Sequence, residues 1–181
     1  AKLLPGARVV QPAAPAQPYQ TLPHVSLGDL AGFLERLQEL GGRVDLAVLA
    51  DDLQLEADEL LPLAEAADLL GLGDIEEGDV FLTAVGQRFI AADVLARKEI
   101  FRHLASVRIQ LIRQIARKLE SEPEHRFADE EILRSMERYF SPDEARRQLD
   151  TAINWGRYGE LFAYDDAVGE FYVEEAETAA R

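Results

Sequence analysis

The chain has no cysteine, and only one tryptophan and one methionine among its 181 residues. Without cysteine it can form no disulfide and can use no thiolate as a nucleophile or metal ligand. No apolar run approaches the roughly 20 residues that a membrane-spanning helix needs, so we expect no direct membrane insertion. The phosphate-binding pattern GxxxxGK[ST] is also missing, which excludes a P-loop nucleotide site within this sequence.

Basic residues are scarce relative to acidic ones. Nineteen Lys and Arg stand against 34 Asp and Glu, which gives a formal net charge of −15. A field of this sign repels phosphate groups, so we do not expect nucleic acid as a partner. The composition otherwise fits a cytoplasmic protein.

Residues that could support catalysis or metal binding do not form recognisable patterns. His24, His103 and His125 lie far apart, and no metal-ligand spacing surrounds them. Gly71-Leu72-Gly73 lacks the third glycine of a dinucleotide-binding fingerprint, so we interpret it as the end of a helix. Consecutive acids such as 165–166 point to different sides of a strand or helix. We therefore predict no catalytic, cofactor-binding or metal-binding residues and no enzyme activity.

The first half of the chain begins with a proline-rich segment at 1–23, which reads as an extended linker or arm. Over 24–93 the pattern predicts a helix capped by Ser26, two helices near 45–52 and 56–70, a hairpin over 75–82 and a helix capped by Thr83. This order is that of a winged helix.

The second half repeats the plan loosely. An apolar stripe over 94–121 predicts one long connecting helix. Over 122–175 the pattern gives a short helix, a helix capped by Ser141 with Glu144 completing a capping box, and a hairpin over 161–174. Residues 176–181 are a tail. The fold class is therefore mainly α with small β-hairpins: tandem winged-helix units joined by a long helix.

Large aromatic rings gather near the end of the chain. We expect the rings of the second hairpin to pack on Trp155 and Tyr158 of the preceding helix, because a two-stranded ribbon is marginal alone. The alternative is a partner surface built from Phe162, Tyr164 and Tyr172.

Residues 95–121 run against the acidic average, with seven basic residues and two acidic ones. Their positive charge balances the acidic units within the fold, or it forms a docking face for an acidic partner or a phosphate. Guanidinium groups suit the second role because they present a fork of donors. The candidate partner or ligand surface comprises Arg102, Arg108, Arg113, Trp155, Tyr158, Phe162 and Tyr164.

The helices that would read DNA in a winged helix have the wrong charge for it. Residues 56–70 contain five acids and no base, and 143–158 balance three acids against Arg146, Arg147 and Arg157. A DNA-binding surface needs basic side chains that displace counterions.

Several blocks resemble one family in the same order. They are LPHVS, LADDLQLEADELLPL, LT-x-x-G, RKEIF and INWGRY-x-ELF-x-YD, spread over about 22–175. Together they resemble the C-terminal AAA-associated domain, which follows the ATP-binding cassette in some bacterial ABC transporter ATPases of the nitrate, sulfonate and bicarbonate group.

The resemblance implies a non-catalytic accessory or regulatory domain that acts through protein contacts with an ABC ATPase cassette and its importer, and leaves room for a homo-oligomer. ATP and Mg are expected only in an associated cassette. The setting would be cytoplasmic, or peripheral at the inner membrane through the transporter. Two other hypotheses stay open: a winged-helix transcription regulator, and a small-molecule or nucleotide sensor with a pocket lined by Trp155, Tyr158 and arginines of the long helix.

Overall fold

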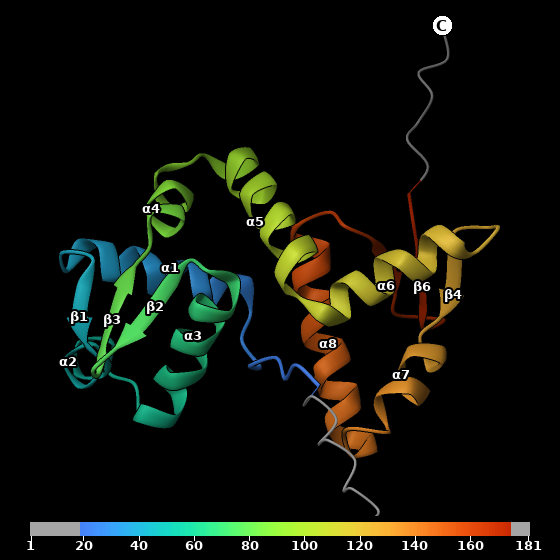
Figure 1. Cartoon of the computed structure of the whole chain (residues 1–181), viewed down its shortest axis with the longest axis horizontal. Coiled ribbons are helices and arrows are strands. Elements are labelled where there is room, and N and C mark those ends of the chain that lie inside the picture. The colour runs from blue at the N-terminus through green and yellow to red at the C-terminus, as the bar shows by residue number, and fades with distance from the viewer. Residues whose placement is uncertain (1–18, 175–181) are drawn as a thin grey trace, which may run out of the picture.

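The computed structural model describes residues 19–174. Most of the predicted linker at 1–23 and the whole tail at 176–181 lie outside the described residues. Within the described part, helices dominate and two small antiparallel sheets lie toward opposite ends of the long axis (Figure 1). The predicted class, mainly α with small β elements, is confirmed.

The first sheet and its helices come from the first half of the chain. In order, the elements are α1 (Leu27–Glu39), β1 (Arg43–Asp45), α2 (Leu46–Leu53), α3 (Ala57–Leu70), β2 (Gly73–Glu76) and β3 (Asp79–Leu82). The sheet order is β1-β3-β2, so the predicted two-stranded hairpin gains a third strand. That strand was missed because its sequence, RVD, has one apolar residue between two charged ones.

Local capping explains where these helices start. The Ser26 hydroxyl accepts a hydrogen bond from Asp29 N, and the Asp45 carboxylate accepts from Ala47 N. Glu56 and Glu59 form a reciprocal capping box at α3. Each cap satisfies backbone donors that have no partner inside the helix. Gly71 ends α3 with a left-handed φ of 72°, as predicted.

The predicted single helix over 94–121 is wrong. After α4 (Ala84–Ala91), the chain forms α5 (Val94–Arg108) and α6 (Gln110–Ser121), separated by Ile109 in extended conformation. The Ile109 side chain is fully buried, so the apolar stripe continues through the break and hides it from a periodicity reading.

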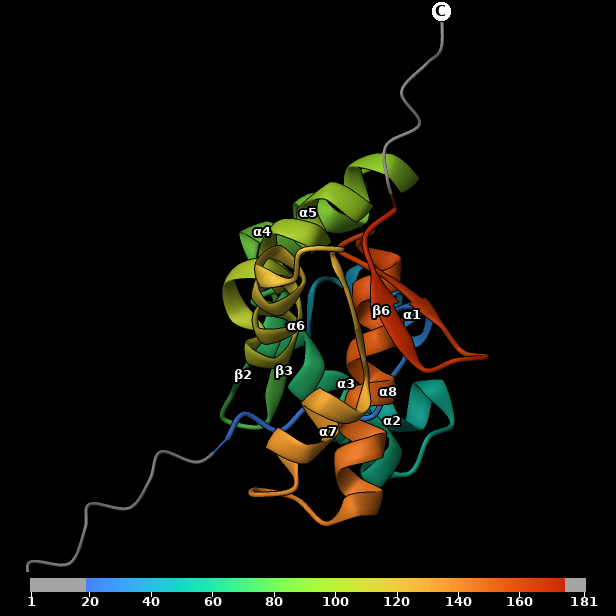
Figure 2. The same cartoon turned by 90° about the vertical axis from the view of Figure 1, so that its right-hand side faces the viewer.

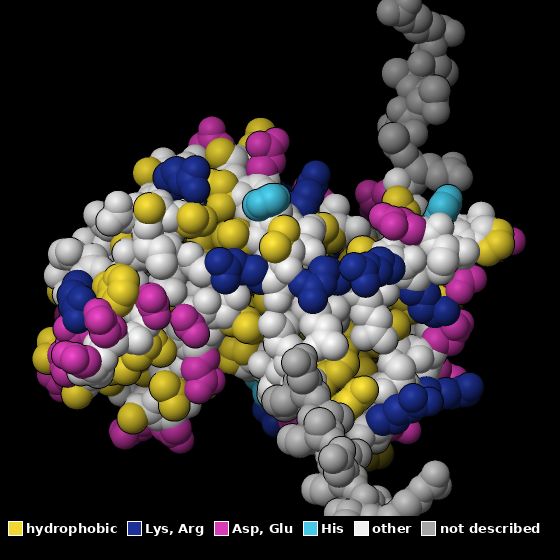
Figure 3. Space-filling view, in the orientation of Figure 1, with side chains coloured by type: hydrophobic (Ala, Val, Ile, Leu, Met, Phe, Trp, Pro, Cys, Tyr) yellow, Lys and Arg dark blue, Asp and Glu magenta, His cyan; other side chains and the backbone are white. Residues whose placement is uncertain are grey.

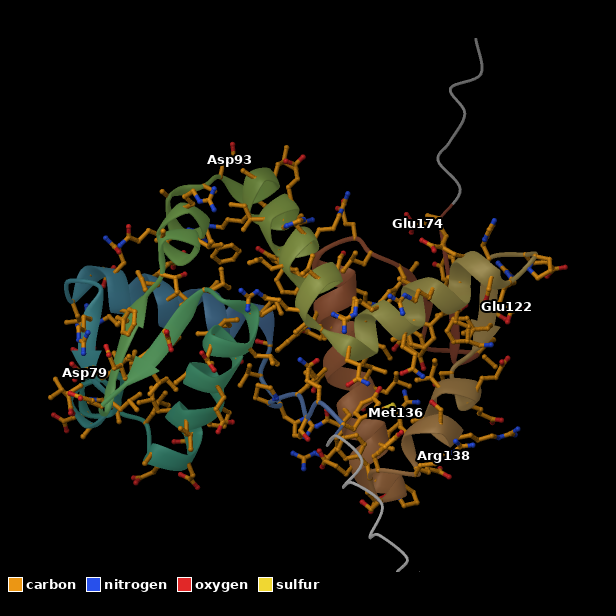
Figure 4. All side chains as sticks on the ribbon, viewed as in Figure 1. Asp79, Asp93, Glu122, Met136, Arg138 and Glu174 are labelled. Atoms are coloured by element: carbon orange, nitrogen blue, oxygen red, sulfur yellow. The ribbon has the colours of Figure 1, made fainter. Side chains whose placement is uncertain are left out.

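From α6 onward, the order of elements in the first half occurs again. The elements are α6, β4 (Arg126–Ala128), α7 (Glu130–Met136), α8 (Pro142–Tyr158), β5 (Ala163–Asp165) and β6 (Glu170–Tyr172). The second sheet has the order β4-β6-β5, which matches β1-β3-β2 strand for strand. Figure 4 shows Asp79 of the first sheet at the opposite end of the molecule from Glu122 and Glu174.

Ser141 caps α8, but the predicted capping box is only half formed. The Ser141 hydroxyl accepts from Glu144 N at 3.2 Å. The Glu144 carboxylate turns instead to His24 Nε2 at 2.8 Å and to Gln148 Nε2 at 2.9 Å.

The last residues of the predicted linker are packed. Leu22 is 1% exposed, and buried Gln148 of α8 accepts from Leu22 N at 2.7 Å and donates to Leu22 O at 2.9 Å. Trp155 Nε1 donates to Val25 O at 2.9 Å. We call residues 19–26 the strap, because they run along α6 and α8 before entering α1; the strap is the blue segment between the two halves in Figure 1.

Candidate functional site

The candidate residues fall into three places. Trp155 is buried and Tyr158 half-buried, both against α5. Arg102, Phe162 and Tyr164 line one cavity. Arg108 and Arg113 lie at the bend between α5 and α6. The seven residues therefore do not form one surface.

The rings of α8 pack on Phe101 of α5. Trp155 is fully buried and meets Phe101 edge to face, with ring centroids 6.4 Å apart. Tyr158 meets the same ring at 5.2 Å, and partial burial raises the pKa of its hydroxyl. The second hairpin does pack on α8, as expected, but Phe162 contacts the helix at Gly156. The ring paired with Trp155 and Tyr158 is that of Phe101, so these two side chains hold α5 against α8.

The hairpin rings find other partners. Phe162 and Tyr164 are 6% and 7% exposed. Phe162 lies edge to face with Phe171 at 5.2 Å, and Phe171 stacks on Phe127 of β4. Because these rings form the core of the second sheet, Phe162 and Tyr164 cannot form the exposed partner surface considered above.

Tyr164 also takes part in a buried polar cluster. Its hydroxyl donates to Asp129 Oδ2 at 2.6 Å, and Arg146 Nη1 donates to the same oxygen at 2.6 Å. Burial and the hydrogen bond to Asp129 raise the pKa of Tyr164. The bonds tie the start of α7 to α8 and β5, so the cluster is fully accounted for by the fold.

One cavity of about 850 Å³ opens beside the second sheet. Arg102 enters it from α5 and Arg157 from the end of α8. Arg102 Nε donates to Gly159 O at 2.7 Å, and Arg157 Nη2 donates to Asp166 Oδ2 at 2.7 Å. Further lining comes from Glu160, Phe162, Tyr164, Tyr172 and Glu174. The cavity is chemically mixed: two guanidinium groups, two carboxylates and aromatic edges.

Most of the basic segment is used inside the molecule. Arg97 pairs with Glu35, Lys98 and Arg102 pair with Glu160, and Lys118 pairs with Glu131. These contacts favour the expectation that the segment balances acidic groups within the fold.

Arg108, Arg113 and Arg117 form no ion pair with any residue of 19–174. Arg108 lies against Gly71, where an added Cβ would come within 2.7 Å of its Cζ, so its charge sits at the C-terminal end of α3. Arg113 Nη1 donates to Val107 O in the last turn of α5. Figure 3 shows a row of Lys and Arg side chains across the middle of the face, over α5 and α6.

The arginines that DNA binding would need are engaged with carboxylates. Arg146 pairs with Asp129 and Asp150, Arg147 with Glu144, and Arg157 with Asp166. Freeing them for phosphate would leave buried Asp129 without its charge partner, which is costly.

Metal binding has no support in the described part of the chain. No group of three or more His, Asp or Glu there could hold an ion. His24 contacts Thr151 and Glu144, and His125 Nδ1 lies 2.9 Å from Leu119 O. No helix of residues 19–174 combines the length and the apolar character needed to cross a bilayer.

Sequence reasoning missed the residues that hold the strap. They are Tyr19 and Gln20 of the strap itself and its partners Gln110, Gln114 and Gln148. Uncharged amides carry no periodic signal. The one available clue was Gln148, which lies on the apolar stripe of a predicted helix and is fully buried.

The sequence matches the model of a known protein family. A family model described as the C-terminal AAA-associated domain matches residues 47–165. No curated protein and no solved structure matches the chain.

Proposed function

Because the chain belongs to the C-terminal AAA-associated domain family, we propose that it is a non-catalytic accessory domain of the ATP-binding subunit of an ABC-type importer. It acts through protein–protein contacts and regulates or assembles the ATPase. ATP and Mg belong to the associated cassette, and the domain works at the cytoplasmic face of the transporter. Each set of three helices and a three-stranded sheet serves as a winged-helix unit.

The observation that carries this proposal is how the charged groups are used. The arginines in the helix position that reads DNA are bound to carboxylates of the same domain. The corresponding helix of the first half, α3, has acidic residues and no basic one. Such a surface repels polyanions and suits contacts with polypeptides.

The test compares the complete ATP-binding subunit with the same subunit lacking this domain. We expect removal of the domain to change the ATP hydrolysis rate, the oligomeric state, or both. An unchanged rate together with an unchanged oligomeric state would overturn the proposal.

A second candidate function, ligand sensing, is favoured by the cavity of about 850 Å³ with Arg102 and Arg157 at its wall. A ligand that binds only the folded state at 100 times its Kd adds about 2.7 kcal/mol of stability. Thermal unfolding with added ATP, ADP or inorganic phosphate measures this gain. Stabilisation that disappears in Arg157→Ala supports sensing, and no stabilisation by any of the three removes it.

A further inference from the structure

The negative charge of the chain is divided very unevenly. Residues 27–93 contain sixteen acids and three bases, a net charge of −13, whereas 94–174 contain sixteen acids and thirteen bases, a net charge of −3. On the face drawn in Figure 3, Asp and Glu gather over the half that contains α2, α3 and the first sheet, and Lys and Arg form the row over α5 and α6. One face therefore has a strongly acidic half and a second half, close to neutral, that a row of basic side chains crosses.

The acidic half includes one stripe of α3. Asp58, Leu61, Glu65 and Asp68 are spaced by three, four and three residues, which places them on one side of the helix. All four are exposed, Leu61 by 46%. None of the three carboxylates forms an ion pair within 19–174. The stripe thus offers charge and an apolar side chain without an internal partner.

The basic row follows the bend between α5 and α6. Arg113 and Arg117 are four residues apart on α6, and Arg108 precedes the bend. Arg113 uses one of its five N–H donors on Val107 O, so the others remain available. Val107 beside them is 57% exposed. The two halves meet where Arg108 lies against Gly71 at the end of α3.

We propose that two copies of this chain pair through this face about a two-fold axis that passes between α3 and α6. A two-fold rotation places the α3 stripe of each copy opposite the α6 row of the other, so the same contact forms twice and the assembly closes as a dimer. The rotation also places the two 27–93 segments, each with a net charge of −13, at opposite ends of the dimer. At that separation salt screens their mutual repulsion.

The test needs only this chain. Its apparent mass is measured by sedimentation or light scattering at high micromolar concentration. At about 0.1 M salt, where the Debye length is about 10 Å, the apparent mass should rise from 20.2 kDa toward twice that value. At about 1 M salt, where the Debye length is about 3 Å, the apparent mass should fall back to that of the monomer. A wild-type chain that stays at 20.2 kDa in both conditions overturns the proposal.

Two charge-reversed variants locate the interface. Glu65→Arg with Asp68→Arg, and Arg113→Glu with Arg117→Glu, should each be monomeric alone. Mixed in equal amounts they should form a one-to-one dimer, because both contacts are then complementary again and the average net charge equals that of the wild type. Arg117→Glu alone leaves the hydrogen bond from Arg113 to Val107 O in place. This single variant should also weaken the dimer, which shows that the loss of dimer does not come from breaking that bond. A salt-resistant dimer, or a mixture that stays monomeric, refutes this interface.

Discussion

Gln20 and Gln110 hold each other's backbone across ninety residues of sequence. Gln110 N donates to Gln20 Oε1 at 2.8 Å, and Gln20 N donates to Gln110 Oε1 at 3.2 Å. Gln20 Nε2 also donates to Arg108 O at 2.9 Å. The strap thus supplies hydrogen-bond partners to both sides of the break between α5 and α6, which would otherwise lack them.

Replacing Gln20 with Ala should destabilise the protein by about 1–2 kcal/mol, because two hydrogen bonds at the break are lost. Urea unfolding gives the free energy. Hydrogen exchange should become faster at Gln110 and the residues beside it.

Thr21→Ala is the matched control. Thr21 is exposed and neighbours Gln20 on the strap, so its loss should change the free energy of unfolding by no more than about 0.5 kcal/mol. Equal effects of both substitutions would mean that the strap stabilises through its backbone alone.

Gln148→Leu should lower the free energy of unfolding by about 2–3 kcal/mol, more than Gln20→Ala does. It leaves Leu22 N and Leu22 O buried without partners, and unsatisfied buried groups carry the full desolvation penalty. Arg147→Ala, one residue earlier on the exposed side of α8, should have almost no effect on urea unfolding. A small effect of Gln148→Leu would show that water replaces the lost amide.

How far the sequence predicts this fold depends on whether the determining contact is local. The caps at Ser26, Thr83 and Ser141 and the turn at Gly71 were predicted because cap and helix are neighbours in the chain. The break at Ile109 was not, because it is held by Gln20 from another part of the sequence. Strand β4, like β1, was missed because three residues are too few to show an alternation of apolar and polar side chains.

The site residues illustrate the same limit. In the second sheet Tyr164 lies opposite Phe171, so these two rings share the buried face. The alternative partner surface considered from the sequence grouped Tyr164 with Tyr172 instead, but Tyr172 lies opposite Ala163. The number of residues in the turn decides which strand positions face each other. A shift of one residue exchanges the two faces of a strand. Tyr164 was therefore identified as a candidate ring but grouped with the wrong position of the partner strand.

Glu144 should make stability depend on pH in the acid range. Its hydrogen bond from Gln148, and then that with His24, lower its pKa below the ordinary value of 4.5. The folded state thus binds this proton less tightly than the unfolded state, so the stabilisation is fully present above pH 4.5 and is lost as pH falls through the folded pKa. In Glu144→Gln this contribution should be absent. The difference in unfolding free energy between wild type and variant should be constant above about pH 5.5 and shrink below about pH 4.5; a difference that grows on acidification contradicts the assignment.

Gly156 lets the second hairpin close on α8, and its replacement should be strongly destabilising. A Cβ at this position would lie 2.1 Å from Phe162 Cζ and 2.6 Å from two further ring carbons. The ring cannot withdraw easily, because it also packs edge to face on Phe171. Overpacking of this kind costs about 1–3 kcal/mol, so Gly156→Ala should lower the free energy of urea unfolding by that amount despite the better helix propensity of Ala.

Gly32→Ala is the control, since Gly32 is exposed on α1 with nothing within 4 Å of an added Cβ. That substitution should stabilise the protein by about 0.5–1 kcal/mol. If both variants were stabilised, Phe162 would have to sit loosely against α8, and the buried second hairpin described above would be incorrect.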